Sequence, residues 1–130
     1  MILAVLEARC DIKFSGLDVY LNVAGGLKIT ETAADLAVAA SLISAKENII
    51  IPEDFVFFGE VSLSGAIRSV GKIENRLKEA EKLGFKKVES PTNTKLVKGL
   101  NIEVFENLDL LSFVNKLSNG IKKIKTENLN

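Results

Sequence analysis

The chain has 130 residues and no net charge, because 17 acidic residues balance 17 basic ones. This length fits one domain that buries about two-thirds of the surface of the unfolded chain. The balanced charge gives no general argument for nucleic-acid binding, so DNA contact requires a local basic patch. Since the chain has no histidine, Ser-His-Asp, Cys-His and histidine-metal chemistry are excluded.

The first segment, Met1–Arg9, is rich in apolar residues and is interpreted as a helix. Cys10 follows it and is the single cysteine, which excludes an intramolecular disulfide and a cysteine-cluster zinc site. We predict that Cys10 is a packed core thiol, since no histidine or second cysteine can activate it. The sequence shows no signal peptide and no apolar run of membrane-spanning length, so we expect a cytoplasmic protein without membrane contact.

The next segment alternates apolar and polar residues over Asp18–Ala24, which predicts a half-buried strand. Gly25-Gly26 interrupts this strand, and Leu27–Ile29 resumes it after a tight turn or bulge. Thr32–Asp35 matches the capping-box pattern, in which the two side chains would satisfy backbone N–H groups at a helix start. An alanine-rich helix is then predicted over Leu36–Ala45, close to the centre of the fold.

The segment Gly59–Gly84 changes period within its length. Residues up to Arg68 alternate in polarity around Gly65, which predicts a hairpin, whereas residues from Ile73 follow a helical period up to the stop at Gly84. Further strands are predicted at Asp54–Phe58, Lys86–Ser90 and Asn101–Phe105, with a short helix through Lys98 and a last helix from Asn107 or Asp109 through Leu117, ended by Gly120. The pattern predicts an α/β fold with a mixed sheet and packed helices over residues 1–120, and a frayed basic tail over 121–130.

Two ordered motifs resemble a known family. Gly59–Val70 and Arg76–Phe85 match the Lon-protease-like domain at the C-terminus of the RadA/Sms DNA-repair family, and Asp18–Ile29 with Ala33–Ala39 forms a second matching block. The resemblance runs from about Leu3 to about Leu117. It implies the ribosomal protein S5 domain 2-like α/β fold of Lon proteolytic domains.

The same resemblance implies that the chain is a fragment. In the family, a zinc motif, an ATPase core and the first strands of the Lon-like domain lie upstream. ATP and zinc are therefore expected only in those parts, with no cofactor or metal in this chain. The sequence agrees, since Gly65–Ile73 has five residues between its glycines and Ile73 where a P-loop requires Ser or Thr.

Lon enzymes use a serine nucleophile and a lysine that accepts its proton. The resemblance places Ala33 at the serine position and Glu74 at the lysine position, so both halves of the dyad are replaced. Lys72 lies two residues earlier, on another helical face, and cannot simply take over. We therefore expect no enzyme activity in this chain, and keep an active or cryptic Lon-type ATP-dependent serine peptidase as the alternative.

Basic residues gather where the predicted hairpin meets the helix: Arg68, Lys72 and Arg76, joined by Lys28 if the two hairpins are neighbours. Several such charges on one face would bind the DNA backbone, with affinity that falls steeply with salt. The alternative is an ordinary solvated face, since acidic residues are interleaved with these cations.

The resemblance implies a protease-inactive domain of a DNA-dependent ATPase, which forms a homo-hexameric ring and contacts single-stranded or branched DNA during repair and recombination. A third possibility is a protein-interaction module without a DNA role.

Overall fold

The computed structural model describes the backbone of residues 1–10 and 31–128, and the side chains of residues 1–10 and 31–119. The predicted strands at Asp18–Ala24 and Leu27–Ile29 lie outside the described residues. The described helices are α1 (Ile2–Cys10), α2 (Asp35–Glu47), α3 (Ile73–Lys82) and α4 (Leu110–Asn128), with 3-10 turns η2 (Thr32–Ala34) and η3 (Thr94–Leu96). The strands are β1 (Phe55–Phe57), β2 (Glu60–Val61), β3 (Ile67–Arg68), β4 (Lys87–Pro91) and β5 (Glu103–Asn107).

The described strands form two separate sheets. A parallel sheet has the order β1-β4-β5, with Val56 opposite Val88 and Val88 opposite Val104. The hairpin of β2 and β3 is antiparallel, with Val61 opposite Ile67, as the alternation around Gly65 predicted. The α/β class is therefore confirmed, although the parallel and antiparallel pairs are divided between two sheets.

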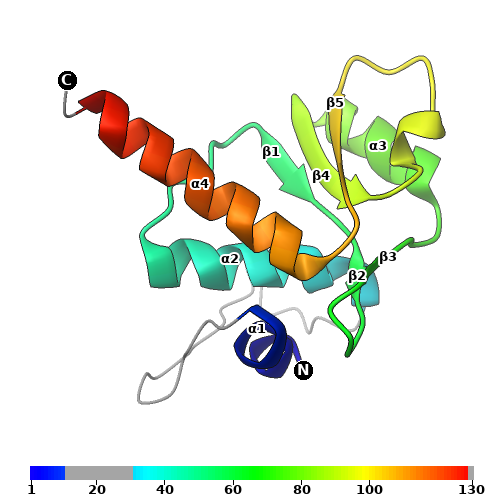
Figure 1. Cartoon of the computed structure of the whole chain (residues 1–130). Coiled ribbons are helices and arrows are strands. Elements are labelled where there is room, and N and C mark those ends of the chain that lie inside the picture. The colour runs from blue at the N-terminus through cyan, green and yellow to red at the C-terminus, as the bar shows by residue number, and fades with distance from the viewer. Residues whose placement is uncertain (11–30, 129–130) are drawn as a thin grey trace, which may run out of the picture.

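The helices cover both faces of the parallel sheet (Figure 1). On one face, Leu77 and Ala80 of α3 pack with Phe58 and Val88 in one apolar cluster. On the other, α2 and α4 join α1 and the hairpin in a second cluster, which contains the fully buried Phe113. Burial of these apolar faces is the main force that holds the layers together.

The start of α2 is attached to the start of the hairpin through Gly59. Its N–H donates to the carbonyl of Ala33 (2.9 Å), and its carbonyl accepts from the N–H of Leu36 (3.0 Å). A Cβ at Gly59 would lie 3.0 Å from Cγ2 of Ile67, so only glycine permits this approach without a shift. The backbone thus places the α2 N-terminus directly against the β2–β3 hairpin.

The predicted capping box was wrong. Thr32 Oγ1 donates to Glu60 Oε2 (3.3 Å), and Asp35 Oδ2 accepts from the N–H of Val61 (3.0 Å). Both polar side chains therefore bind the hairpin, because Gly59 already satisfies a donor at the helix start.

The predicted end of the last helix at Gly120 was also wrong, since α4 continues to Asn128. One glycine inside a helix costs only about 1 kcal/mol relative to alanine, and the residues after it include no proline. The predicted start is confirmed at Asp109, whose Oδ1 accepts from the N–H of Ser112 (2.8 Å).

Candidate functional site

The resemblance to Lon enzymes predicted that Ala33 and Glu74 occupy the dyad positions, and the structure shows the surroundings of both residues. Ala33 lies in η2, is 4% exposed, and presents a methyl group where a nucleophile would require a hydroxyl. Glu74 lies in the first turn of α3 and forms an exposed ion pair with Lys78 (3.0 Å). This pair has the favourable orientation for the helix, with the acid four residues before the base.

Hydroxyl and acid groups near Ala33 have structural partners. Thr32 is bonded to Glu60, as described above, and Asp35 is bonded to the N–H of Val61. Burial raises the pKa of Asp35 above its ordinary value of 3.8, and the negative charge of Glu60 raises it further, while the hydrogen bond from Val61 lowers it.

The structure describes three of the four predicted cations, and it brings two of these three together. Lys72 is the N-cap residue of α3 with a left-handed backbone (φ 58°), and Arg76 lies one turn further along that helix. Arg76 Nε donates to the carbonyl of Gly71 (2.8 Å), and its guanidinium forms an ion pair with Glu31. Lys72 is exposed and forms no ion pair with any residue that the structure describes.

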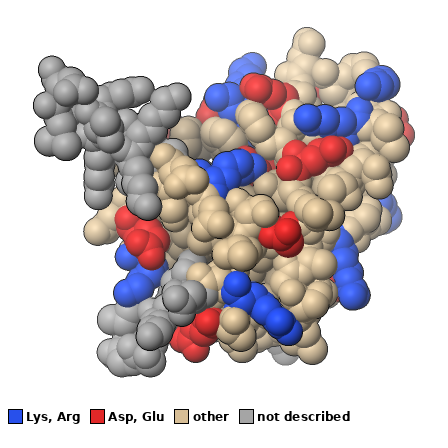
Figure 2. All heavy atoms as spheres, viewed as in Figure 1, with Lys and Arg blue, Asp and Glu red and all other residues tan. Residues whose placement is uncertain are grey.

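Arg68 does not belong to this pair. Arg68 is an exposed residue of β3 that lies opposite Glu60 in the hairpin register, and it lines a different hollow together with Asp35 and Glu60. Lys28 lies outside the described residues. Figure 2 shows acidic and basic side chains interspersed over the face in view, so no single-sign surface covers it.

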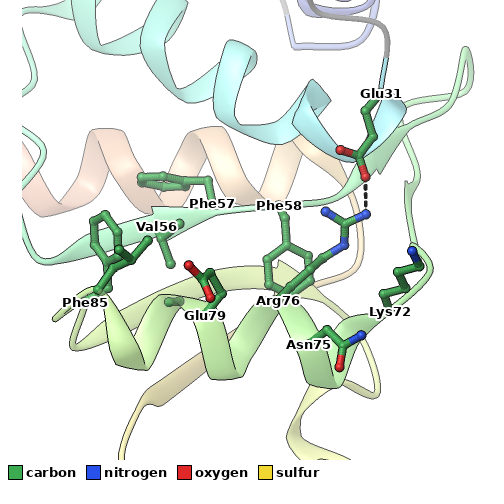
Figure 3. Close-up of a pocket in the computed structure, with 11 residues that line it drawn as sticks. Glu31, Val56, Phe57, Phe58, Lys72, Asn75, Arg76, Glu79 and Phe85 are labelled. Carbon is green, nitrogen blue, oxygen red and sulfur yellow. Dashed lines mark hydrogen bonds and ion pairs between the residues drawn. The ribbon is translucent and has the colours of Figure 1, made fainter.

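Lys72 and Arg76 stand at one end of an open pocket of about 490 Å³ between β1 and α3 (Figure 3). Asn75 and Glu79 of α3 add polar groups to the pocket, and Glu31 closes it on the α2 side. The apolar part of the lining consists of Val56, Phe57, Phe58, Ala80, Leu83 and Phe85. The pocket is therefore amphipathic, with cations at one end and aromatic residues along the strand.

The sequence prediction missed Glu31 and the aromatic lining. The run Phe55–Phe58 was interpreted only as a buried strand, although it directly precedes the Gly59-Glu60-Val61 motif that carries the family resemblance. No local pattern indicated that Glu31 belongs to this pocket, because its partner Arg76 lies 45 positions away in the chain.

No group of three or more Cys, Asp or Glu side chains within the described ranges is arranged to hold a metal ion. The described helices also include none that is long and apolar enough to span a bilayer.

Comparison with known proteins shows the family to which the chain belongs. The family model of ChlI, described as subunit ChlI of Mg-chelatase, matches residues 2–94, which is most of the chain. The chain therefore belongs to this family.

Several curated relatives of the chain are named DNA repair protein RadA. The DNA repair protein RadA of Brucella abortus is 51% identical over 119 residues, which cover 91% of this chain and 26% of the relative. RadA of Rickettsia typhi is 61% identical over 88 residues (68% of this chain, 20% of the relative), and RadA of Aquifex aeolicus is 50% identical over 104 residues (80% and 22%). The chain thus spans about a quarter of the length of these relatives, and the resemblance to the RadA/Sms family is confirmed.

Proposed function

We propose that this chain is a protease-inactive Lon-like domain that acts in DNA repair as part of a RadA-type protein, as a scaffold that contacts DNA. The observation that carries the proposal is Ala33: the nucleophile position holds a buried methyl group at the point where α2 meets the hairpin. The identity to proteins named DNA repair protein RadA supports the repair role.

The peptidase alternative has little support from the geometry. A serine-lysine mechanism requires a lysine that desolvation keeps neutral. The dyad position Glu74 is 63% exposed, and its neighbour Lys78 is 60% exposed, so a lysine in this part of α3 would remain hydrated and protonated.

DNA contact is proposed at Lys72 and Arg76. Lys72 is exposed, and Arg76 is held on the same pocket by Gly71 and Glu31. A phosphate group can bind the free ammonium of Lys72 and compete with Glu31 for the guanidinium of Arg76. We expect Arg68, which lies beside Glu60, to contribute less.

The test is fluorescence anisotropy with a labelled single-stranded oligonucleotide and a labelled forked duplex, over a range of salt concentrations. The variants Lys72→Gln and Arg76→Gln should each weaken binding and should each reduce the single-strand salt slope by about 0.7. The matched control is Lys98→Gln, which removes an exposed lysine that lies near β5, away from this pocket. Equal effects of all three variants would refute a defined site, and no binding at low salt would leave the protein-interaction module as the better proposal.

The scaffold part of the proposal concerns self-association into a homo-hexameric ring. Light scattering after size exclusion measures the molar mass, which is 14.1 kDa for one chain. A mass near six chains supports the ring, whereas a monomer at every concentration tested contradicts ring formation by this chain.

A further inference from the structure

A second pocket lies on the sheet face that α4 covers, away from Lys72 and Arg76. It has a volume of about 290 Å³ and lies between β1, β5, α4 and the segment 49–52. Its walls are mostly apolar: Ile51, Pro52, Phe55, Phe57, Phe105 and Leu117. The ring of Phe55 stacks with the rings of Phe57 (centroids 6.2 Å apart) and Phe105 (6.0 Å), so the walls are aromatic and mutually supported.

A buried carboxylate opens into this pocket. The side chain of Glu89 is 6% exposed, and its Oε2 accepts hydrogen bonds from Asn107 Nδ2 (2.8 Å) and Lys116 Nζ (2.5 Å). Its other oxygen, Oε1, accepts no hydrogen bond from the described part of the chain. Every fully buried side-chain polar atom of the described residues has a partner, so Oε1 retains some accessible surface. Glu89 is one of the residues that line the pocket.

A donor stands beside this acceptor. Lys116 Nζ donates to Glu89 Oε2 and to Asn107 Oδ1 (2.8 Å), and it lies 5.8 Å from the ring centroid of Phe105. An ammonium group has three N–H donors, and these two acceptors use two of them. Lys116 is 42% exposed and also lines the pocket, and its ammonium lies 5.7 Å from the ring centroid of Phe113. A ligand acceptor would therefore compete only with weak ring contacts for the third N–H.

The charges decide which ligand fits. Lys116 neutralises Glu89, so the pocket offers one acceptor and one donor without net charge. A charged ligand would lose hydration against the apolar walls without finding an unpaired counter-charge. A neutral group with a donor and an acceptor side by side can satisfy both protein atoms, and the aromatic walls can bind an apolar part next to it.

We infer that this pocket binds a carboxamide, namely an Asn or Gln side chain of a partner polypeptide that also places an apolar residue against Phe55 and Phe105. The amide NH₂ donates to Glu89 Oε1, and the amide carbonyl accepts from Lys116. This contact uses neither Lys72 nor Arg76 of the proposed DNA surface, although Phe57 lines both pockets, and it goes beyond the repair role.

The experiment uses the whole chain and three small probes with one shared ring: benzamide, benzoate and benzylamine, which is cationic at neutral pH. Each is titrated into the isotopically labelled protein, and binding is followed by amide chemical shifts. Benzamide should bind tightest, with shifts concentrated in β1, β5 and the segment 49–52. Tighter binding of benzoate or benzylamine, or benzamide shifts elsewhere in the protein, would overturn the inference.

Variants then test the named groups. Lys116→Met keeps the length of the side chain and removes the donor, and should weaken benzamide binding about three- to tenfold. Lys82→Met, which removes an exposed lysine of α3, is the matched control and should leave benzamide binding unchanged. If Lys116→Met does not fold, Phe105→Leu decides, since it removes an aromatic wall and leaves the three polar groups in place.

Phe105→Leu should weaken benzamide binding and leave DNA binding unchanged. This outcome separates the pocket from the proposed DNA surface. Benzamide affinity equal to that of the unmodified protein in the folded variants would refute the site.

Discussion

Arg76 on α3 forms an ion pair with Glu31, which directly precedes η2 and lies 45 positions earlier in the chain. The pair spans the end of the pocket between β1 and α3, where Lys72 also lies (Figure 3). It connects the segment next to Ala33 to the helix that carries Glu74. The pair also engages the guanidinium of Arg76, which we propose for DNA contact.

Glu31→Gln should therefore increase DNA affinity about two- to fivefold, because it frees the guanidinium of Arg76 and removes a charge that repels phosphate. The free energy of unfolding should fall by less than about 1 kcal/mol, since Glu31 is 61% exposed and solvent screens the pair. Anisotropy and urea denaturation measure the two effects.

The control for this prediction is Glu79→Gln. Glu79 lines the same pocket, carries the same charge and forms no ion pair with the described residues. An equal gain in affinity from both variants would mean that net charge, and not the release of Arg76, causes the effect.

Restoring the dyad side chains should not restore proteolysis. The double variant Ala33→Ser with Glu74→Lys replaces both positions, but the position of Glu74 is 63% exposed, so a lysine there should stay hydrated and should not serve as a neutral base. Hydrolysis of labelled casein by the double variant should equal that of the unmodified chain. Cleavage well above that of either single variant would show that the fold retains a working site.

Asp35 should make the stability depend on pH. Since burial raises the pKa of Asp35 in the folded state, folding favours its protonated form, and its contribution to stability is lost as the pH rises through the raised pKa. Asp35→Asn keeps an acceptor for the N–H of Val61 but cannot ionise. Its free energy of unfolding should therefore fall less than that of the unmodified protein as the pH rises. Urea denaturation at a series of pH values from 3.8 upward measures the free energy of unfolding of both proteins. An equal dependence of this free energy on pH in the two proteins would contradict the prediction.

Cys10 should be nearly inert in the folded protein. It is 9% exposed, as the sequence predicted, and burial raises the pKa of its thiol, with a further increase from the negative charge of Asp109. A thiol reagent should label native protein at least about tenfold more slowly than protein in urea, because the thiolate is the reactive form. Similar rates in both states would place Cys10 in contact with solvent.

Local patterns were sufficient for most elements. The helical period from Ile73 predicted α3, the alternation around Gly65 predicted the β2–β3 hairpin, and the apolar runs predicted the strands of the parallel sheet. The errors came where a local signal competed with a distant partner. Thr32 and Asp35 have the spacing of a capping box, yet their side chains bind hairpin residues 28 and 26 positions away.

By itself, the sequence determined the α/β class and the family, because these depend on local periodicity and on ordered motifs. It also predicted that Ala33 and Glu74 replace a Ser-Lys pair. Only the tertiary structure decided which charges share a surface. It joined Arg76 to Glu31, separated Arg68 from Lys72, and placed Lys116 beside Glu89. The two ion pairs connect residues that are 45 and 27 positions apart in the chain. Their energies depend on burial and distance, which the packing of helices against the sheet fixes.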